Sequence, residues 1–434
     1  MIRAKKGGIF AAVGAATGLG NAFRFPALCA KYGLVFIFAY ALCLALIGYP
    51  LLCAELNYGR NARRNKGGNA LAIIMRAAAA NSAVIALYYG VIACKLGGAC
   101  ANYAISANVD TYGYMPYLTA FIIFPAVYFI LQSGGSALNI SGKISVCSSL
   151  ALFVFLALKG LLKGVFSPDL TSLLCGELWV EAVGQTLLSL SLAAGVMPTF
   201  AQTLQGGSAY TAALKITGAN FIGCVAAALS VCPFIDGAEF EGGIACAFTV
   251  YPQVISAAAA SWVGRRILGV CVYGALTAVG VHSLCSLATP LLSRLKSVKS
   301  SAAKKTVFKF NLPVFIFCAL SALFAPVLEI NGGEGLSCCD RVACCVTAVS
   351  VALAECLLFA YRGGGNAILC FLIKFICPAV CGVAAVLSIC SARFSGFGAL
   401  SLCLGFFSFA FPVSFALTPL CSRLKKRIKN SANP

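Results

Sequence analysis

The chain is poor in charge, and poorest in acidic side chains. Only 10% of its 434 residues are charged, with 12 Asp or Glu against 32 Lys or Arg. Soluble domains carry about 25% charged residues and about 45–50% apolar ones, whereas 61% of this chain is hydrophobic. No water-facing surface can be built from this composition, which excludes a soluble enzyme. A net charge of +20 would suggest nucleic acid in a soluble protein, but here membrane topology is the first explanation to test.

The sequence also lacks the residue clusters of catalytic and metal sites. There is one histidine, and the 24 cysteines include no Cys-x-x-Cys pair. Most cysteines stand singly inside apolar runs, where they act as small buried hydrophobic residues. A membrane enzyme is therefore not expected, and we assign no catalytic residue.

Twelve apolar stretches are long enough to cross a bilayer, which takes about 20 residues of helix. We therefore expect an all-α polytopic membrane protein with about 12 transmembrane helices. The stretches cover 9–28, 34–57, 81–107, 115–132, 144–163, 179–203, 216–235, 262–292, 311–328, 342–361, 366–390 and 398–421.

The basic residues gather on one side of these spans. With the N-terminus in the cytoplasm, the cytoplasmic segments hold 22 Lys or Arg and no Asp or Glu. This segregation predicts a multi-pass protein with both termini cytoplasmic, and we expect a bacterial plasma membrane. The first apolar stretch runs into further spans without a small-residue cleavage site, so no cleaved signal peptide is expected. The positive charge is thus explained by topology, and no nucleic-acid partner is expected.

Two spans contain residues that interrupt a membrane helix. The first holds three glycines and an asparagine between Gly14 and Asn21, and the sixth holds serines, a glycine and a proline between Gln185 and Pro198. A glycine packing face is the alternative explanation for the first span. If the first ten spans form two five-helix repeats, however, the two breaks occupy corresponding positions. Paired breaks of this kind expose backbone groups that bind ions and solutes, and they predict a secondary transporter for a small anionic or zwitterionic solute.

The segment Gly14–Pro26, GAATGLGNAFRFP, closely resembles the first span of the neurotransmitter:sodium symporters, whose bacterial members transport amino acids. Further matches follow in the family's order at Ile47–Glu55, Tyr88-Tyr89, Val183–Leu192, Asn220, Leu276-Thr277, Asp340 and Glu355. The resemblance covers nearly the whole chain and is weakest in the last two spans. It implies a LeuT-type 5+5 inverted repeat with helices 1 and 6 broken. Residues 1–163 would form the first repeat, 164–361 the second, and 362–434 two additional helices with a basic cytoplasmic tail.

The resemblance also implies sodium sites built from oxygen atoms. The first would use Ala16, Asn21, Ser189 and Asn220 together with the substrate carboxylate. The second would use the carbonyls of Gly14, Thr17 and Gly274 and the hydroxyl of Thr277. Because Ala278 stands where the family usually has a second hydroxyl, we expect either one or two sodium ions.

The substrate pocket implied by the resemblance draws on the same two breaks. The Tyr89 hydroxyl and the amides around Gly18 and Gly20 would hold the carboxylate of an amino acid. The full predicted set is Ala16, Gly18, Leu19, Gly20, Ile85, Tyr89, Leu188, Ser189, Ser191, Ala194, Ala278 and His282. Leu188 and Ala194 replace bulkier side chains of the family, which favours a large hydrophobic or aromatic amino acid. Three roles stay open for His282: a hydrogen bond to a neighbouring helix, contact with the substrate, or titration during transport.

Charged and polar residues complete the implied site. Arg24 and Asp340 match the family's outer gate, although a static ion pair is the alternative. The chloride site of chloride-dependent members is matched at Tyr40, Gln185, Ser189 and Asn220, while Cys224 takes the fifth place, so a chloride ion stays an open expectation. The acid that the family places near the end of span eight is absent from Leu291–Arg294, so closure toward the cytoplasm must rest on other contacts.

The leading prediction is a sodium-coupled symporter that imports an amino acid by alternating access. Two alternatives stay open: an amino-acid-binding membrane sensor, and a transporter with altered coupling to a proton or to a single sodium ion. The expected partners are the amino acid and the lipid bilayer, and the sequence does not set an oligomeric state.

Overall fold

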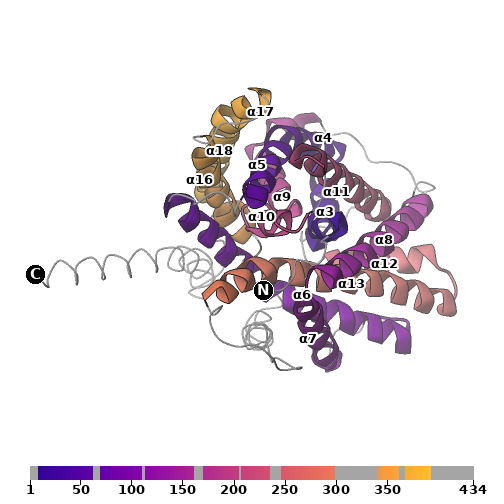
Figure 1. The fold of residues 1–434 in the computed structure, drawn as a ribbon. Helices are drawn as coiled ribbons and strands as arrows, with labels where there is room; N and C mark the ends of the chain where they lie inside the picture. The colour runs from indigo at the N-terminus through magenta and orange to yellow at the C-terminus, as the bar shows by residue number, and fades with distance from the viewer. Residues whose placement is uncertain are drawn as a thin grey trace, which may run out of the picture.

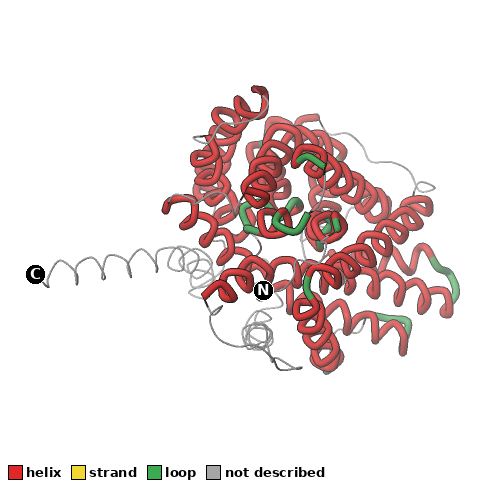
Figure 2. The backbone as a smooth tube through the Cα atoms, in the orientation of Figure 1, coloured by secondary structure: helices red, strands yellow, loops and turns green. Residues whose placement is uncertain are grey.

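A computed structural model describes residues 8–61, 69–109, 113–160, 170–204, 207–234, 246–298, 340, 342–360 and 367–391. These residues are almost entirely helical (Figure 1, Figure 2). Within the described part, seven helices are long and apolar enough to cross a membrane. The all-α polytopic fold predicted from composition is confirmed.

The helices up to residue 160 correspond to the first five predicted spans. They are α1 (Ile9–Ala16), α2 (Leu19–Ala22), α3 (Arg24–Tyr32), α4 (Leu34–Cys43), η1 (Leu44–Gly48), α5 (Tyr49–Asn61), α6 (Asn69–Ser106), α7 (Met115–Ser133) and α8 (Gly135–Gly160). The π-helical turn η1 immediately precedes Tyr49-Pro50. Proline has no N–H for the helical ladder, which accounts for the wider turn before it.

The later helices are η3 (Leu170–Leu174), α9 (Gly176–Ser189), α10 (Val196–Ala201), α11 (Ala209–Val231), η4 (Cys232–Phe234), α12 (Cys246–Ala258), α13 (Trp262–Val298), η7 (Val342–Thr347), α16 (Ala348–Ala360), α17 (Ala367–Phe371), η8 (Leu372–Ile376) and α18 (Cys377–Ser391). Ten of the twelve predicted spans are thus found as helices, while 311–328 and 398–421 lie outside the described residues. The 13-residue α12 was not predicted.

Both predicted helix breaks are present. Span one leaves the helical conformation at Thr17 and Gly18, between α1 and α2, and span six does so over residues 190–195, between α9 and α10. Figure 2 shows short non-helical segments among the central helices. Ser191 and Ala193 have positive φ angles of 51° and 54°, which non-glycine residues adopt only when the surrounding structure holds them there.

The two breaks meet in the interior of the helical bundle. The Ser191 hydroxyl donates a hydrogen bond of 3.0 Å to the Ala15 carbonyl, joining the break of span six to that of span one. The long helices α6 and α13 pack along each other, and α1 packs against α8, α11 and α13. Polar atoms freed at the breaks therefore lie inside the protein.

Most cysteines serve the packing of this interior. Of the 17 cysteines whose side chains the structure describes, 12 are buried. No group of three or more His, Cys, Asp or Glu residues suited to a metal ion occurs among the described residues. The buried, hydrophobic role expected of the cysteines holds for these positions.

Candidate functional site

A small cavity lies between the two breaks and the helices α6 and α13. Its volume is about 30 Å³, so the surrounding side chains leave little free space. The lining residues are Ala15, Gly18, Gly20, Asn21, Ile85, Tyr89, Leu187, Leu188, Ser189, Ser191, Leu192, Ala194, Ser283, Ser286, Leu287 and Ala348. The wall is mostly apolar, with a few polar groups contributed by the breaks.

Eight of the twelve predicted substrate residues line this cavity: Gly18, Gly20, Ile85, Tyr89, Leu188, Ser189, Ser191 and Ala194. The other four lie elsewhere. The Ala16 carbonyl accepts a hydrogen bond from Asn21. Leu19 lines a smaller space beside the cavity, and Ala278 lines a different cavity between α8 and α13. His282 packs against Gly14 rather than into the cavity.

The four residues predicted for the first sodium site form one buried cluster. The Asn21 amide nitrogen donates to the Ala16 carbonyl at 3.1 Å and to Oδ1 of Asn220 at 2.7 Å. The Asn220 amide nitrogen lies 3.3 Å from the Ser189 hydroxyl. Oδ1 of Asn21 is buried without a hydrogen-bond partner. An unpartnered buried oxygen beside other oxygens fits a sodium ion, for which oxygen atoms are the suitable ligands.

The residues predicted for the second sodium site are not brought together. A Cβ on Gly14 would lie 2.6 Å from Nε2 of His282, so the imidazole fills the space beside Gly14. Gly274 lines the cavity between α8 and α13. The hydroxyls of Thr277 and Thr17 donate to carbonyls of their own helices. The residue of α13 that lies beside Gly14 is therefore His282, about one and a half turns beyond Thr277, and the second sodium site stays a prediction.

The donor groups of the residues matched to a chloride site already have hydrogen-bond partners, whereas Oε1 of Gln185 is buried without one. The Tyr40 hydroxyl lies 2.8 Å from the Ser189 hydroxyl and accepts from the Asn220 amide at 2.6 Å. The Cys224 thiol lies 3.6 Å from the same hydroxyl. The Gln185 amide donates to a backbone carbonyl of the first break at 3.3 Å. A role in chloride binding stays a prediction.

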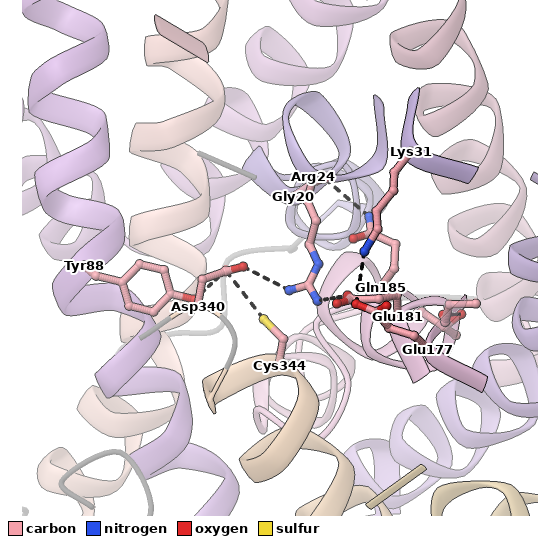
Figure 3. A network of polar contacts seen from close by, with 11 residues as sticks. Gly20, Arg24, Lys31, Tyr88, Glu177, Glu181, Gln185, Asp340 and Cys344 are labelled. Carbon is pink, nitrogen blue, oxygen red and sulfur yellow. Dashed lines mark hydrogen bonds and ion pairs between the residues drawn. The ribbon is translucent and has the colours of Figure 1, made fainter. Parts of the chain in front are cut away.

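The ion pair expected between Arg24 and Asp340 is formed, at 2.9 Å, beside the cavity (Figure 3). The same guanidinium pairs with Glu181 at 2.7 Å, a partner that the sequence did not single out. The Tyr88 hydroxyl donates to Asp340 at 3.1 Å. Tyr89 lines both the cavity and the small space next to Asp340, so this network stands directly against the candidate binding site.

The intramembrane acids Glu55 and Glu355 lie in contact with each other, and both are fully buried. Oε1 of Glu55 accepts a hydrogen bond of 2.9 Å from the amide of Ala193. Glu55 therefore holds the positive-φ segment of span six in place. It binds the protein backbone and is not among the residues that line the cavity.

The sequence predicted a contribution of α13 to the cavity, but from Ala278 and His282, which do not line it. Ser283, Ser286 and Leu287 line it, at the spacing of one helical face. This periodicity is visible in the sequence, but several faces of α13 have similar patterns. Only the contact with the break of span one singles out the correct face.

Three comparisons with known proteins bear on the site. Residues 3–107 match the model of the Sodium:neurotransmitter symporter family. The rat sodium-dependent neutral amino acid transporter B(0)AT2 is 27% identical over 51% of this chain, a match that spans only 39% of the rat protein. An uncharacterized sodium-dependent transporter of Methanocaldococcus jannaschii, MJ1319, is 24% identical over 75% of this chain and 74% of its own length.

The structure is similar to the crystal structure of MhsT in complex with L-phenylalanine. The TM-score is 0.73 at 21% sequence identity, over 88% of this chain and 97% of MhsT. At this identity the likeness establishes the fold alone. The resemblance predicted from Gly14–Pro26 is thereby confirmed: the chain is similar in sequence to the sodium:neurotransmitter symporters and shares the LeuT-type fold with MhsT.

Proposed function

We propose that this protein is a sodium-coupled symporter that imports an amino acid by alternating access. The observation that carries the proposal is the meeting of two broken helices around one cavity. The Ala15–Ser191 hydrogen bond joins them, and oxygens of both spans face the cavity or the cluster at Asn21. Broken helices of this kind supply ion and solute ligands in secondary transporters.

Sodium is proposed as the coupling ion because of the cluster around Asn21. Its unpartnered Oδ1, the Ala16 carbonyl and the side-chain oxygens of Ser189 and Asn220 are the type of ligand that sodium takes. The names of the rat and archaeal relatives, both called sodium-dependent, support this choice. We propose a single sodium ion, because His282 stands beside Gly14 where the second was expected.

A neutral amino acid with a large hydrophobic side chain is the proposed substrate. The cavity wall contains Ile85, Leu187, Leu188, Leu192 and Leu287, and the cost of burying an unpaired charge against such a wall disfavours charged side chains. The rat relative's name specifies neutral amino acids, and MhsT was crystallised with L-phenylalanine. Both support the proposal.

Uptake into liposomes tests the function. Purified protein is reconstituted, an inward sodium gradient is imposed, and uptake of radiolabelled leucine, phenylalanine, glutamate and lysine is measured. We expect leucine or phenylalanine to accumulate above its external concentration, and glutamate and lysine not to accumulate.

Replacing external sodium by choline is the control for coupling. Uptake that is unchanged in choline would overturn the sodium coupling. Binding of an amino acid without accumulation under the gradient would instead favour the alternative of a membrane sensor.

Tyr89→Phe is expected to weaken amino-acid binding by about ten- to a hundredfold. A hydrogen bond to a charged group contributes about 1.5–3 kcal/mol, and the Tyr89 hydroxyl is proposed to donate one to the substrate carboxylate. Tyr89 lines the cavity, and its hydroxyl would lie 3.9 Å from a Cβ on Gly20. Equilibrium binding of labelled leucine to purified protein measures the effect.

Tyr103→Phe is the matched control for Tyr89→Phe. Tyr103 is a buried tyrosine on the same helix that stacks on Tyr273, away from the cavity. We expect its loss of a hydroxyl to leave binding within about twofold. Equal affinities of the Tyr89→Phe variant and the unaltered protein would contradict the carboxylate assignment.

A further inference from the structure

The only histidine of the chain, His282, lies at the junction of three helices. It is fully buried in α13 and contacts α1 and α8. The helices α8 and α13 lie side by side (Figure 1). The ring lies outside the substrate cavity and takes no part in the proposed function described above.

Two glycines form the slot that holds the imidazole. A Cβ on Gly14 of α1 would lie 2.6 Å from Nε2 of the ring. A Cβ on Gly142 of α8 would lie 3.0 Å from its Cε1 and would collide with the Phe10 carbonyl. The close packing of α1 against α8 and α13 around the ring therefore depends on the absence of a Cβ at both positions.

The hydrogen bonds of the ring suit a neutral imidazole and can be rearranged for a charged one. Nε2 lies 3.2 Å from the Ala11 carbonyl, which only accepts, so Nε2 carries a hydrogen. Nδ1 lies 2.8 Å from the Ser141 hydroxyl, which also lies 3.0 Å from the Leu138 carbonyl. If Ser141 donates to Nδ1 the ring is neutral, and if it donates to Leu138 it can accept from a protonated Nδ1.

The surroundings decide between these two states. The described residues of α1 include no titratable side chain, and Lys143 and Cys147 of α8 are exposed. Cys285 lies three residues further along α13, and no charged group among the described residues acts on the ring. An imidazolium buried without a counter-charge is unfavourable, so the seated arrangement favours the neutral ring.

We propose that His282 is a proton-binding site coupled to the seating of α1. The neutral ring fastens α1 to α8 and α13 through Ala11 and Ser141. When α1 separates, water reaches the imidazole and the ring takes up a proton, which opposes the return of α1. The ligand is a proton, bound at Nδ1 on the Ser141 side of a ring whose Nε2 side lies beside Gly14, where a second sodium ion was expected.

This inference rests on the proposed function in one respect: movement of α1 affects transport only if it opens one side of the transport cavity. The coupling between proton binding and α1 is a property of the protein itself. It can therefore be measured without transport.

Histidine-selective labelling tests the coupling, because one histidine gives one set of ring signals. Protein labelled with ¹³C,¹⁵N-histidine is titrated by nuclear magnetic resonance in lipid nanodiscs. We expect the Nε2–H tautomer at neutral pH. In Gly14→Ala, whose new Cβ prevents the close seating of α1, the ring should protonate at a pH at least about one unit higher, a tenfold gain in proton affinity.

Gly218→Ala is the control, since nothing lies within 4 Å of a Cβ at that position on α11. It should titrate as the unaltered protein does. Equal midpoints in Gly14→Ala and the unaltered protein, or an Nδ1–H tautomer at neutral pH, would overturn the proposal. If Gly14→Ala does not fold, the unaltered protein is titrated in sodium with leucine and in choline alone, and an identical midpoint in both overturns the coupling.

Transport gives a second readout. Glutamine at position 282 offers an N–H toward Ala11 and an oxygen toward Ser141 but does not titrate. We expect uptake by the unaltered protein to change at least threefold between pH 5.5 and 7.5, and uptake by His282→Gln to be flat. Ser148→Ala, on the same helix as Ser141 but bonded to a carbonyl of its own helix, should keep the normal pH profile. An unchanged profile in His282→Gln would contradict a role in transport, and absence of uptake in every protein would contradict the proposed function without touching the titration result.

Discussion

Asn21→Ala is expected to raise the sodium concentration for half-maximal uptake by about tenfold or more. Changes even to groups that only orient a metal ligand cost about 10–100-fold in affinity, and Asn21 is proposed to bind the ion directly. Its Oδ1 is buried and has no protein partner, while its amide nitrogen holds the Ala16 carbonyl and Asn220 in place. Initial uptake rates at a series of sodium concentrations measure the effect.

Asn81→Ala separates this effect from the truncation of any buried asparagine. Asn81 is also fully buried, on α6, and does not line the cavity. We expect its sodium dependence to match that of the unaltered protein, whatever its stability. If Asn21→Ala and Asn81→Ala have the same sodium dependence, the cluster around Asn21 is not the ion site.

Arg24→Gln is expected to destabilise the protein and to lower uptake by about tenfold or more. The Arg24 side chain is 9% exposed and pairs with Glu181 and Asp340, which are 19% and 17% exposed. Removing one partner of a largely buried ion pair costs about 3–5 kcal/mol, because the remaining charge stays unpaired. Here two carboxylates would be left facing each other. Thermal unfolding and initial uptake rates measure the two effects.

A second substitution tests this explanation. Adding Glu181→Gln to Arg24→Gln removes one of the two unpaired charges, so we expect part of the lost stability to return. Lys31→Gln is the control on the same surface. Its pair with Glu177 is 52% and 54% exposed, and such exposed pairs contribute about 0–1 kcal/mol. If Lys31→Gln is as damaging as Arg24→Gln, burial of the Arg24 network is not the cause.

The residues predicted for the first sodium site lie together because the motif that contains Asn21 is short and local. Ala16 and Asn21 are five residues apart across one break, and their contact follows wherever that break forms. Asn220 and Ser189 were matched through the family's order, and both join the cluster. The residues predicted for the second sodium site form no such cluster among the described contacts, for the opposite reason. It required a particular turn of α13 to face α1, and successive turns of an apolar helix offer similar residues.

The Arg24 network likewise contains one contact that the sequence predicted and one that only the tertiary structure reveals. A charged side chain inside the membrane is usually paired with an opposite charge. The sequence indicated Asp340 as the partner of Arg24, and the two form an ion pair. Glu181 lies in α9, within the predicted span 179–203, and no motif marked it as a partner of Arg24. Its contact with the guanidinium depends on how α9 packs beside span one.

The scarcity of charge by itself determined a membrane protein, because so few polar side chains cannot cover a water-facing surface. Hydropathy determined where helices occur, and glycine and proline determined where two of them break, since these effects are local to the chain. Only the tertiary structure decided which turn of α13 meets α1. That register depends on Gly14 and Gly142 leaving room for one imidazole, and such packing arises between segments that hydropathy treats independently.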